Sequence, residues 1–215
     1  MKETTISIFV IAALSLTGCR SAYYKTMEAF GQHKRDLLVG RVEDARDAQE
    51  DAKEQFKSAL EKFTDVVSVS GGKLQDKYNL LKSELDKSKS KAKSVRSRIS
   101  SVENVAKALF KEWENELDQY SSDALRRSSE QKLKTTRQRY SQLIAAMKRA
   151  ESKIAPVLTA FNDQVLFLKH NLNAQAIASL QSELASVEAD IATLIKEMEA
   201  SIAEADEFIS AMAGT

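Results

Sequence analysis

Apolar and small residues recur along most of the chain at alternating steps of four and three. The longest such run extends from Leu74 to Trp113, and similar runs extend from Leu38 to Val66 and from Ser129 to Phe161. This heptad spacing is the pattern that winds α-helices into left-handed coiled coils. The positions of the longest run are Leu74, Tyr78, Leu81, Leu85, Ser88, Ala92, Val95, Ile99, Val102, Ala106, Leu109 and Trp113.

Short polar stretches interrupt the heptads at similar intervals. The Gly71–Gly72 pair permits the positive φ of a helix end and a tight reversal, and Ser122 is suited to cap a helix that begins after residue 120. A third break falls either at Pro156, because a proline kinks or ends a helix, or near Asn171. The rival to both is one unbroken helix from Val157 to Met212.

The distribution of charge favours one of these alternatives. Residues 126–153 carry a net charge of +7 and residues 183–207 a net charge of −7. Only a turn near Asn171 lays much of the acidic run on the basic one. Similarly, residues 43–54 carry −4 and face residues 86–98, which carry +5, when the chain is folded so that partner numbers sum to about 141.

The sequence therefore predicts an all-α fold, a long antiparallel coiled coil arranged as an up-down-up-down four-helix bundle over residues 37–215. Its turns are expected near 70, 120 and 171. One proline and six glycines are too few for the many turns of a β-fold. Charge pairing is expected at only two of the four interfaces, with like charges side by side at the others. This leaves two oppositely charged outer faces, which suggests weak, salt-sensitive self-association or contact with a partner.

The first nineteen residues have the features of a targeting segment. Lys2 precedes an apolar stretch at 6–16 that is too short to span a bilayer, and Leu16-Thr17-Gly18-Cys19 resembles the bacterial lipobox. The resemblance implies cleavage by signal peptidase II before Cys19 and lipidation of this cysteine, the only one in the chain. The alternative is an ordinary secretory signal with a chance cysteine. We expect a signal peptide at 1–18 and a lipidated, membrane-proximal anchor at 19–36.

The residue after the cysteine indicates which membrane holds the lipoprotein. By the sorting rule of enteric lipoproteins, Arg20 in place of Asp favours the outer membrane, with the chain facing the periplasm. The inner membrane is the alternative location, because the rule varies between bacteria. The next residues, among them Tyr23, Tyr24, Met27 and Phe30, are suited either to the membrane interface or to packing on the base of the bundle.

Candidate chemistry is sparse. Glu112, Glu114, Glu116 and Asp118 surround Trp113, but their alternate spacing scatters them around a helix, so a solvated face is favoured over a cation site. Trp113 itself occupies a core position. The two histidines, His33 and His170, are expected at opposite ends of the bundle, where they share no metal. His170 is suited either to contact a partner at the tip or, as we favour, to cap helix carbonyls. We predict no catalytic residue, no cofactor-binding residue, no metal site and no enzymatic activity.

Several segments carry a resemblance to a known family, and they are Tyr23–Met27, His33–Asp36, Arg41–Gln49, Glu112–Glu114, Leu125–Ser129 and Lys169–Gln175. Through them the chain resembles an uncharacterised family of helical lipoproteins from proteobacteria, a domain of unknown function, over the whole mature chain. Some members are labelled "DNA repair ATPase". We attribute this label to coiled-coil composition, because Gly71-Gly72-Lys73 lacks the phosphate cradle G-x-x-x-x-G-K-[ST].

Three classes of function follow from these observations. The favoured class is a structural, scaffolding or protein-interaction lipoprotein of the cell envelope, bound to the membrane through acylated Cys19 and to an envelope protein of unknown identity. The alternative is a membrane-remodelling or membrane-stress protein resembling phage-shock-type hairpins, although the chain lacks an amphipathic insertion helix. An enzyme or a nucleic-acid-binding coiled coil is disfavoured by the lipobox and by the missing catalytic motifs, and a net charge of +1 gives no overall basicity that would favour nucleic acid.

Overall fold

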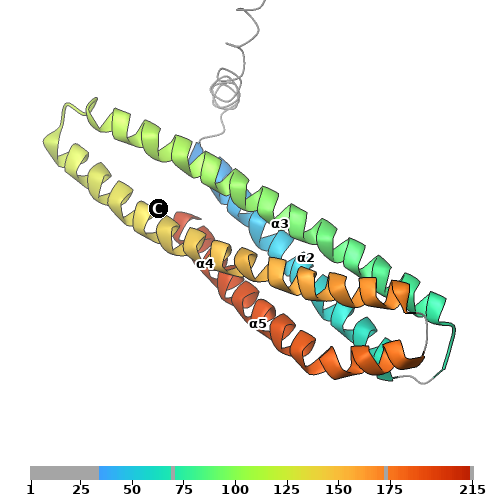
Figure 1. The fold of residues 1–215 in the computed structure, drawn as a ribbon. Coiled ribbons are helices and arrows are strands. Elements are labelled where there is room, and N and C mark those ends of the chain that lie inside the picture. Colours follow the sequence, from blue (N-terminus) through green and yellow to red (C-terminus); the bar gives the residue numbers. More distant parts are fainter. Residues whose placement is uncertain (1–33, 69–70, 172–173, 214–215) are drawn as a thin grey trace, which may run out of the picture.

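Four long helices make up the part of the chain that the computed structural model describes, which is residues 34–68, 71–171 and 174–213. Two of the breaks between these helices lie at residues 118–122 and at Asn171, close to the turns expected near 120 and 171. No strand occurs within the described residues. The helices, in chain order, are α2 (Lys34–Ser68), α3 (Leu74–Leu117), α4 (Asp123–His170) and α5 (Ala174–Ala213) (Figure 1).

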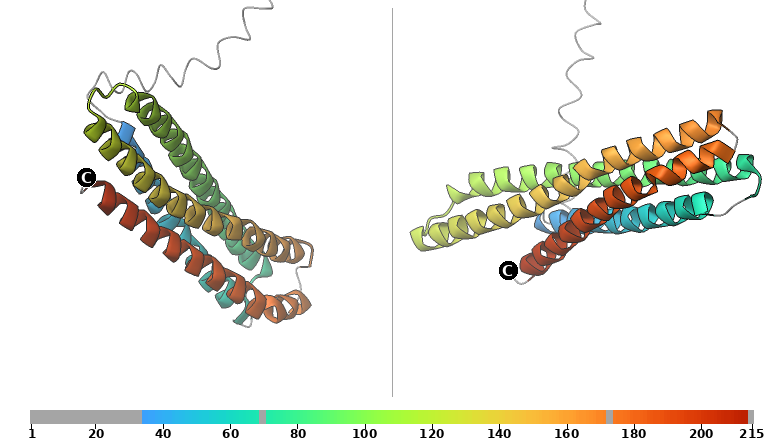
Figure 2. Two further views of the ribbon diagram at one scale, coloured as in Figure 1. Left: turned by 90° about the vertical axis from the view of Figure 1, so that its left-hand side faces the viewer. Right: turned by 60° about the horizontal axis from the view of Figure 1, so that its bottom comes forward.

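The helices form one bundle in which each packs against two others. The four interfaces are α2–α3, α3–α4, α4–α5 and α5–α2. The start of α2, the α3–α4 turn and the end of α5 lie at one end, here called the proximal end (Figure 2). The α2–α3 and α4–α5 connections lie at the other, distal end. The predicted all-α, up-down-up-down four-helix bundle is confirmed.

The heptad positions fill the interior of the bundle over its length. Phe63 of α2 and Phe161 of α4 meet edge to face across the core, with ring centroids 6.2 Å apart. Burial of one such side chain stabilises the fold by about 1.5–3 kcal/mol. No helix in the described ranges is both long and apolar enough to cross a membrane. The largest fully buried side chains are Phe56, Phe63, Phe161, Leu38, Leu81, Ile99, Leu143, Met147, Leu168, Leu180, Ile191 and Leu194.

The helix ends use the residues that their local chemistry suggests. Gly71 and Gly72 adopt φ of 89° and 84°, the left-handed conformation in which glycine has no steric cost. Ser122 caps α4, because its side chain accepts a hydrogen bond from the backbone N–H of Leu125 at 3.4 Å. Helix α4 continues through Pro156 and ends at His170, which excludes both the break at Pro156 and the unbroken helix from Val157.

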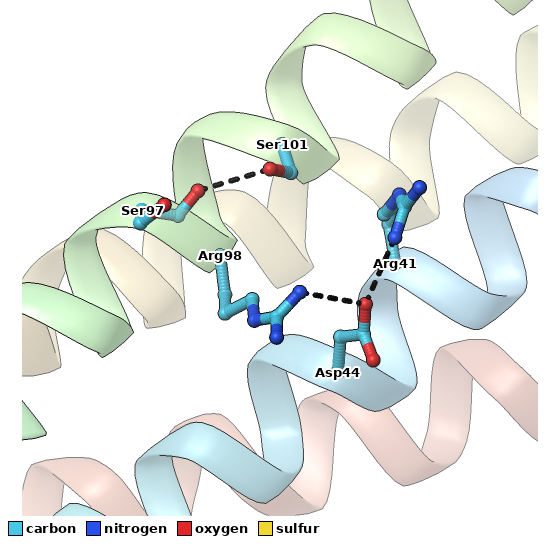
Figure 3. Close-up of polar contacts among 5 residues, drawn as sticks. All are labelled: Arg41, Asp44, Ser97, Arg98 and Ser101. Atoms are coloured by element: carbon cyan, nitrogen blue, oxygen red, sulfur yellow. Dashed lines mark hydrogen bonds and ion pairs between the residues drawn. The ribbon is translucent and has the colours of Figure 1, made fainter.

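The expected register of α2 against α3 is present. Lys91 Nζ lies 2.6 Å from Asp51 Oδ2, and Arg98 Nη1 lies 3.2 Å from Asp44 Oδ2, so partner numbers sum to 142. Figure 3 shows Asp44 also accepting from Arg41 of its own helix at 3.1 Å. The predicted pairing of the acidic run 43–54 with the basic run 86–98 is therefore confirmed.

The expectation of like charges at the other two interfaces is wrong, because each of them contains ion pairs. Arg46 of α2 reaches Asp206 of α5 at 3.0 Å. At α3–α4, the antiparallel register sets the basic half of α4 against the acidic end of α3. By contrast, one ion pair joins the predicted +7 and −7 runs of α4 and α5 in the described structure. It is formed by Arg149 and Glu197, at 3.8 Å. The α3–α4 pairs are Arg96–Glu151, Arg137–Glu114 and Lys148–Glu103.

One polar pair lies inside the otherwise apolar core. Gln49 of α2 and Ser201 of α5 are fully buried, and Ser201 Oγ donates to Gln49 Oε1 at 2.8 Å. The Nε2 of Gln49 is buried without a hydrogen-bond partner among the described residues. A buried amide satisfied at one end costs stability, and such groups are known to specify register in coiled coils.

We predict that Gln49→Leu raises the free energy of unfolding by about 1 kcal/mol, because it removes an amide of which one end is unsatisfied. Ser201→Ala, the matched variant, should lower it by about 1–3 kcal/mol, because it leaves the whole amide buried without a partner. Urea unfolding followed by circular dichroism measures both. Equal destabilisation by the two variants would show that the amide is well satisfied.

A second prediction concerns pH. Burial raises the pKa of Tyr140 to about 12, and the carboxylate of Glu103 adds to the rise. The unfolded phenol titrates near pH 10, so its burial stabilises the fold fully below about pH 10, and this contribution is lost as the pH rises through about 12. We expect the free energy of unfolding to fall between pH 10 and 12 less steeply in Tyr140→Phe than in the unchanged protein. Equal slopes in urea titrations would contradict the prediction.

Candidate functional site

The proximal end of the bundle contains a hollow of about 530 Å³. It arises because α3 and α4 extend beyond the start of α2 and the end of α5 (Figure 1). Lys34, the first residue of α2, already meets Glu112 near the end of α3 at 2.6 Å, and Arg35 donates to the carbonyl of Met212. The lining residues include Trp113, Tyr120, Leu125, Ser129, Lys132, Arg139 and Met212.

Hydrogen bonds to one serine hold the aromatic wall of this hollow. Trp113 Nε1 donates to Ser129 Oγ at 2.8 Å, and the Tyr120 hydroxyl lies 3.4 Å from the same oxygen. Trp113 is half-buried at the edge of the core, so the prediction that it is a core residue holds only in part. Leu125 remains 60% exposed and Tyr120 42% exposed. The hollow therefore has an aromatic and apolar wall, with Lys132 and Arg139 also among its lining residues.

Two of the four acidic residues around Trp113 are engaged in ion pairs, and the other two, Glu116 and Asp118, are exposed. Glu112 binds Lys34, and Glu114 lies 2.5 Å from Arg137 Nη1, whose hydrogen bond lowers the pKa of the Glu114 carboxyl despite some desolvation. The Arg137 guanidinium also lies over the Phe110 ring, 5.2 Å from its centroid. Within residues 34–68, 71–171 and 174–213, no group of three or more His, Cys, Asp or Glu could hold a metal ion.

The remaining sequence candidates are far from this hollow or outside the described ranges. Cys19 and His33 lie outside the residues that the structure describes. His170 is exposed at the distal end, and the prediction that it caps α4 is wrong. The cap is Asn171, whose backbone N–H and side-chain amide both donate to Phe167 O, because a residue just beyond the helix reaches the last carbonyls more directly.

Two oppositely charged sides are the second candidate for function. The layer of α3 and α4 carries twenty Lys or Arg and eleven Asp or Glu, a net charge of +9. The layer of α2 and α5 carries eight Lys or Arg and seventeen Asp or Glu, a net charge of −9. The two oppositely charged faces that the sequence predicts are thus present.

Sequence reasoning missed the hollow and the serine that orders it. Trp113 and Ser129 are both visible as heptad positions, but they lie on different helices, and no local pattern shows that their side chains meet. The one local signal was Tyr120, an aromatic residue within the otherwise polar stretch that forms the α3–α4 turn.

We predict that Ser129→Ala lowers the free energy of unfolding by about 1 kcal/mol, because the indole N–H of Trp113 loses its acceptor in a half-buried position. Ser128→Ala, at the exposed neighbouring position, is the matched control and should leave stability unchanged within about 0.5 kcal/mol. Urea unfolding followed by the fluorescence of Trp113, the only tryptophan, measures both. Equal stability of the two variants would show that the bond contributes nothing.

Comparison with known proteins places the chain in one family. The family described as "Protein of unknown function (DUF2959)" matches residues 23–212, which include nearly all of the four helices. No curated protein and no solved structure matches the chain significantly. Because the match covers most of the sequence, the protein belongs to the DUF2959 family of proteins of unknown function.

Proposed function

We propose that this protein is a lipid-anchored structural or protein-interaction module of the bacterial cell envelope, held to the membrane by acylated Cys19 and facing the periplasm. The observation that carries the proposal is the Leu16-Thr17-Gly18-Cys19 motif, which places the only cysteine fifteen residues before the first described helix. Two acyl chains on one residue provide stable attachment, whereas a single chain binds only marginally.

The shape of the bundle supports a scaffolding role. The longest helix, α4, has 48 residues, which corresponds to about 70 Å at 1.5 Å per residue. Buried residues occur at heptad positions along the length of each of the four helices, so the bundle is a rod. Its contact surfaces are therefore its two charged sides and its ends. In this proposal the anchor lies at the proximal end, and the rod presents its sides and its distal end to an envelope protein.

The anchor is tested with Cys19→Ala expressed in a Gram-negative host. We expect loss of the acyl mass in intact-protein mass spectrometry, accumulation of the uncleaved precursor and loss of the mature protein from the membrane fraction. Ser21→Ala, which leaves the motif intact, is the matched control and should be processed normally. Unchanged mass and fractionation of the Cys19→Ala protein would refute the lipoprotein proposal.

Two further measurements test the membrane location and the class of function. Arg20→Asp should move the protein from the outer to the inner membrane of an enteric host, if the sorting rule applies. The lipidated protein should bind liposomes without changing their shape in electron micrographs. Tubulation of the liposomes would instead support the membrane-remodelling alternative.

A further inference from the structure

The two sides of the bundle carry opposite net charge, although each contains residues of both signs. The net charges of +9 on α3 and α4 and −9 on α2 and α5 cancel, in a chain whose formal net charge is +1. The ion pairs that join the two layers in the described structure are too few to neutralise either side; they are Lys34–Glu112, Lys91–Asp51, Arg98–Asp44 and Arg149–Glu197. The molecule therefore has a strong dipole that is perpendicular to its long axis.

On the positive side, cations without ion pairs line the outer seam between α3 and α4. Lys93 is one turn from Lys89, whose Nζ donates to Asn162 of α4 at 2.9 Å. Lys107 is one turn from Glu103, which pairs with Lys148 of α4, and Lys134 is two heptads before Lys148. We call Lys93, Lys107 and Lys134 the basic seam. All three are exposed, and none has an ion pair in the described structure.

On the negative side, the seam between α2 and α5 has the opposite character. Glu43 precedes Arg46 by three residues, and Arg46 reaches across this seam to Asp206. Glu199 is one heptad before Asp206, and Glu188 continues the same helix toward the distal end. We call Glu43, Glu188 and Glu199 the acidic seam. These carboxylates are exposed and have no ion pair among the described residues.

We propose that copies of this protein associate side by side, with the basic seam of one copy against the acidic seam of the next. The two sides are equal in magnitude, opposite in sign and borne by helices of similar length, so a second copy complements both of them. A basic side alone would attract an anionic membrane or an acidic protein, but neither accounts for the matching acidic side. The observations therefore favour a second copy.

The geometry of this association follows from the positions of the two seams. They lie on opposite sides of the bundle, so the contact is heterologous: each copy uses a different surface from its neighbour and keeps one surface free. Such a contact adds further copies in a row. A sideways translation also keeps every proximal end on the same side of the row. All anchors then face one membrane if Cys19 is acylated, although the contact itself does not require acylation.

Charge reversal on each seam tests the proposal. The first variant carries Lys93→Glu, Lys107→Glu and Lys134→Glu, which gives it two acidic seams. The second carries Glu43→Lys, Glu188→Lys and Glu199→Lys, which gives it two basic seams. All six positions are exposed and unpaired, and circular dichroism with thermal unfolding verifies that each variant folds. The mature chain is studied with its anchor in a density-matched, non-ionic detergent by sedimentation equilibrium.

We expect the unchanged protein to associate at 20 mM salt and its association constant to fall by about tenfold or more at 300 mM, where screening shortens the reach of charges well below 10 Å. Each variant alone should be monomeric at 20 mM salt. An equimolar mixture of the two variants should associate again, because an acidic seam then meets a basic one. This rescue separates a seam-to-seam contact from loss of folding or from association through the anchors in one micelle.

Three results would overturn the proposal: an unchanged protein that is monomeric at low salt, a mass independent of salt, or a mixture that stays monomeric. Vesicles of phosphatidylglycerol provide the competing outcome. If the unchanged protein binds them at low salt, loses binding in the first variant and does not self-associate, the basic seam is a lipid-binding surface. The sedimentation result does not depend on whether Cys19 is acylated, so failure of this proposal and failure of the anchor are separate results.

Discussion

The structure depends on the burial of a narrow apolar stripe that each helix carries and cannot bury alone. Helices α2 to α5 present apolar side chains at alternating steps of three and four, and closing four such stripes on one another removes them from water over the length of the rod. The other helix faces are mainly polar, with exposed apolar side chains at Leu80, Leu125, Leu166 and Phe167. The fold therefore supplies long charged sides and two ends, and its hollow exists only where α2 and α5 stop before α3 and α4.

Apolar burial alone does not choose how the helices are aligned along their length, because a shift by one heptad buries a similar stripe. Polar contacts make that choice. Asp44 and Asp51 meet Arg98 and Lys91 in a single register, and the Gln49–Ser201 pair aligns α2 with α5 inside the core. Each exposed ion pair contributes only about 0.2–1 kcal/mol. Their combined effect is to disfavour slipped arrangements rather than to hold the bundle together.

The same charges connect the fold to the proposed roles. Residues that do not pair across an interface collect on two opposite sides, and these sides are the largest surfaces that the molecule offers to other macromolecules. The proximal end adds a different chemistry, with Trp113 and Tyr120 ordered by Ser129 beside exposed Leu125.

The sequence by itself determined the features that are encoded locally. Heptad spacing defined the helices, Gly71–Gly72 and Ser122 marked their ends, and opposite charge runs predicted both the α2–α3 register and the break near Asn171 over the one at Pro156. These predictions succeed because periodicity, caps and neighbouring antiparallel helices depend on residues close in the chain or joined by one short turn.

Only the tertiary structure decided which residues of neighbouring helices meet. Small shifts along the helix axes add up over several turns, and they change which residues lie opposite one another. The basic half of α4 lies against the acidic end of α3, so Arg137 pairs with Glu114 where like charges were expected. The contact of Trp113 with Ser129 and the hollow beside it depend on how far each helix extends past its neighbours. Such offsets are set by the packing of all four helices together, and no single stretch of sequence contains them.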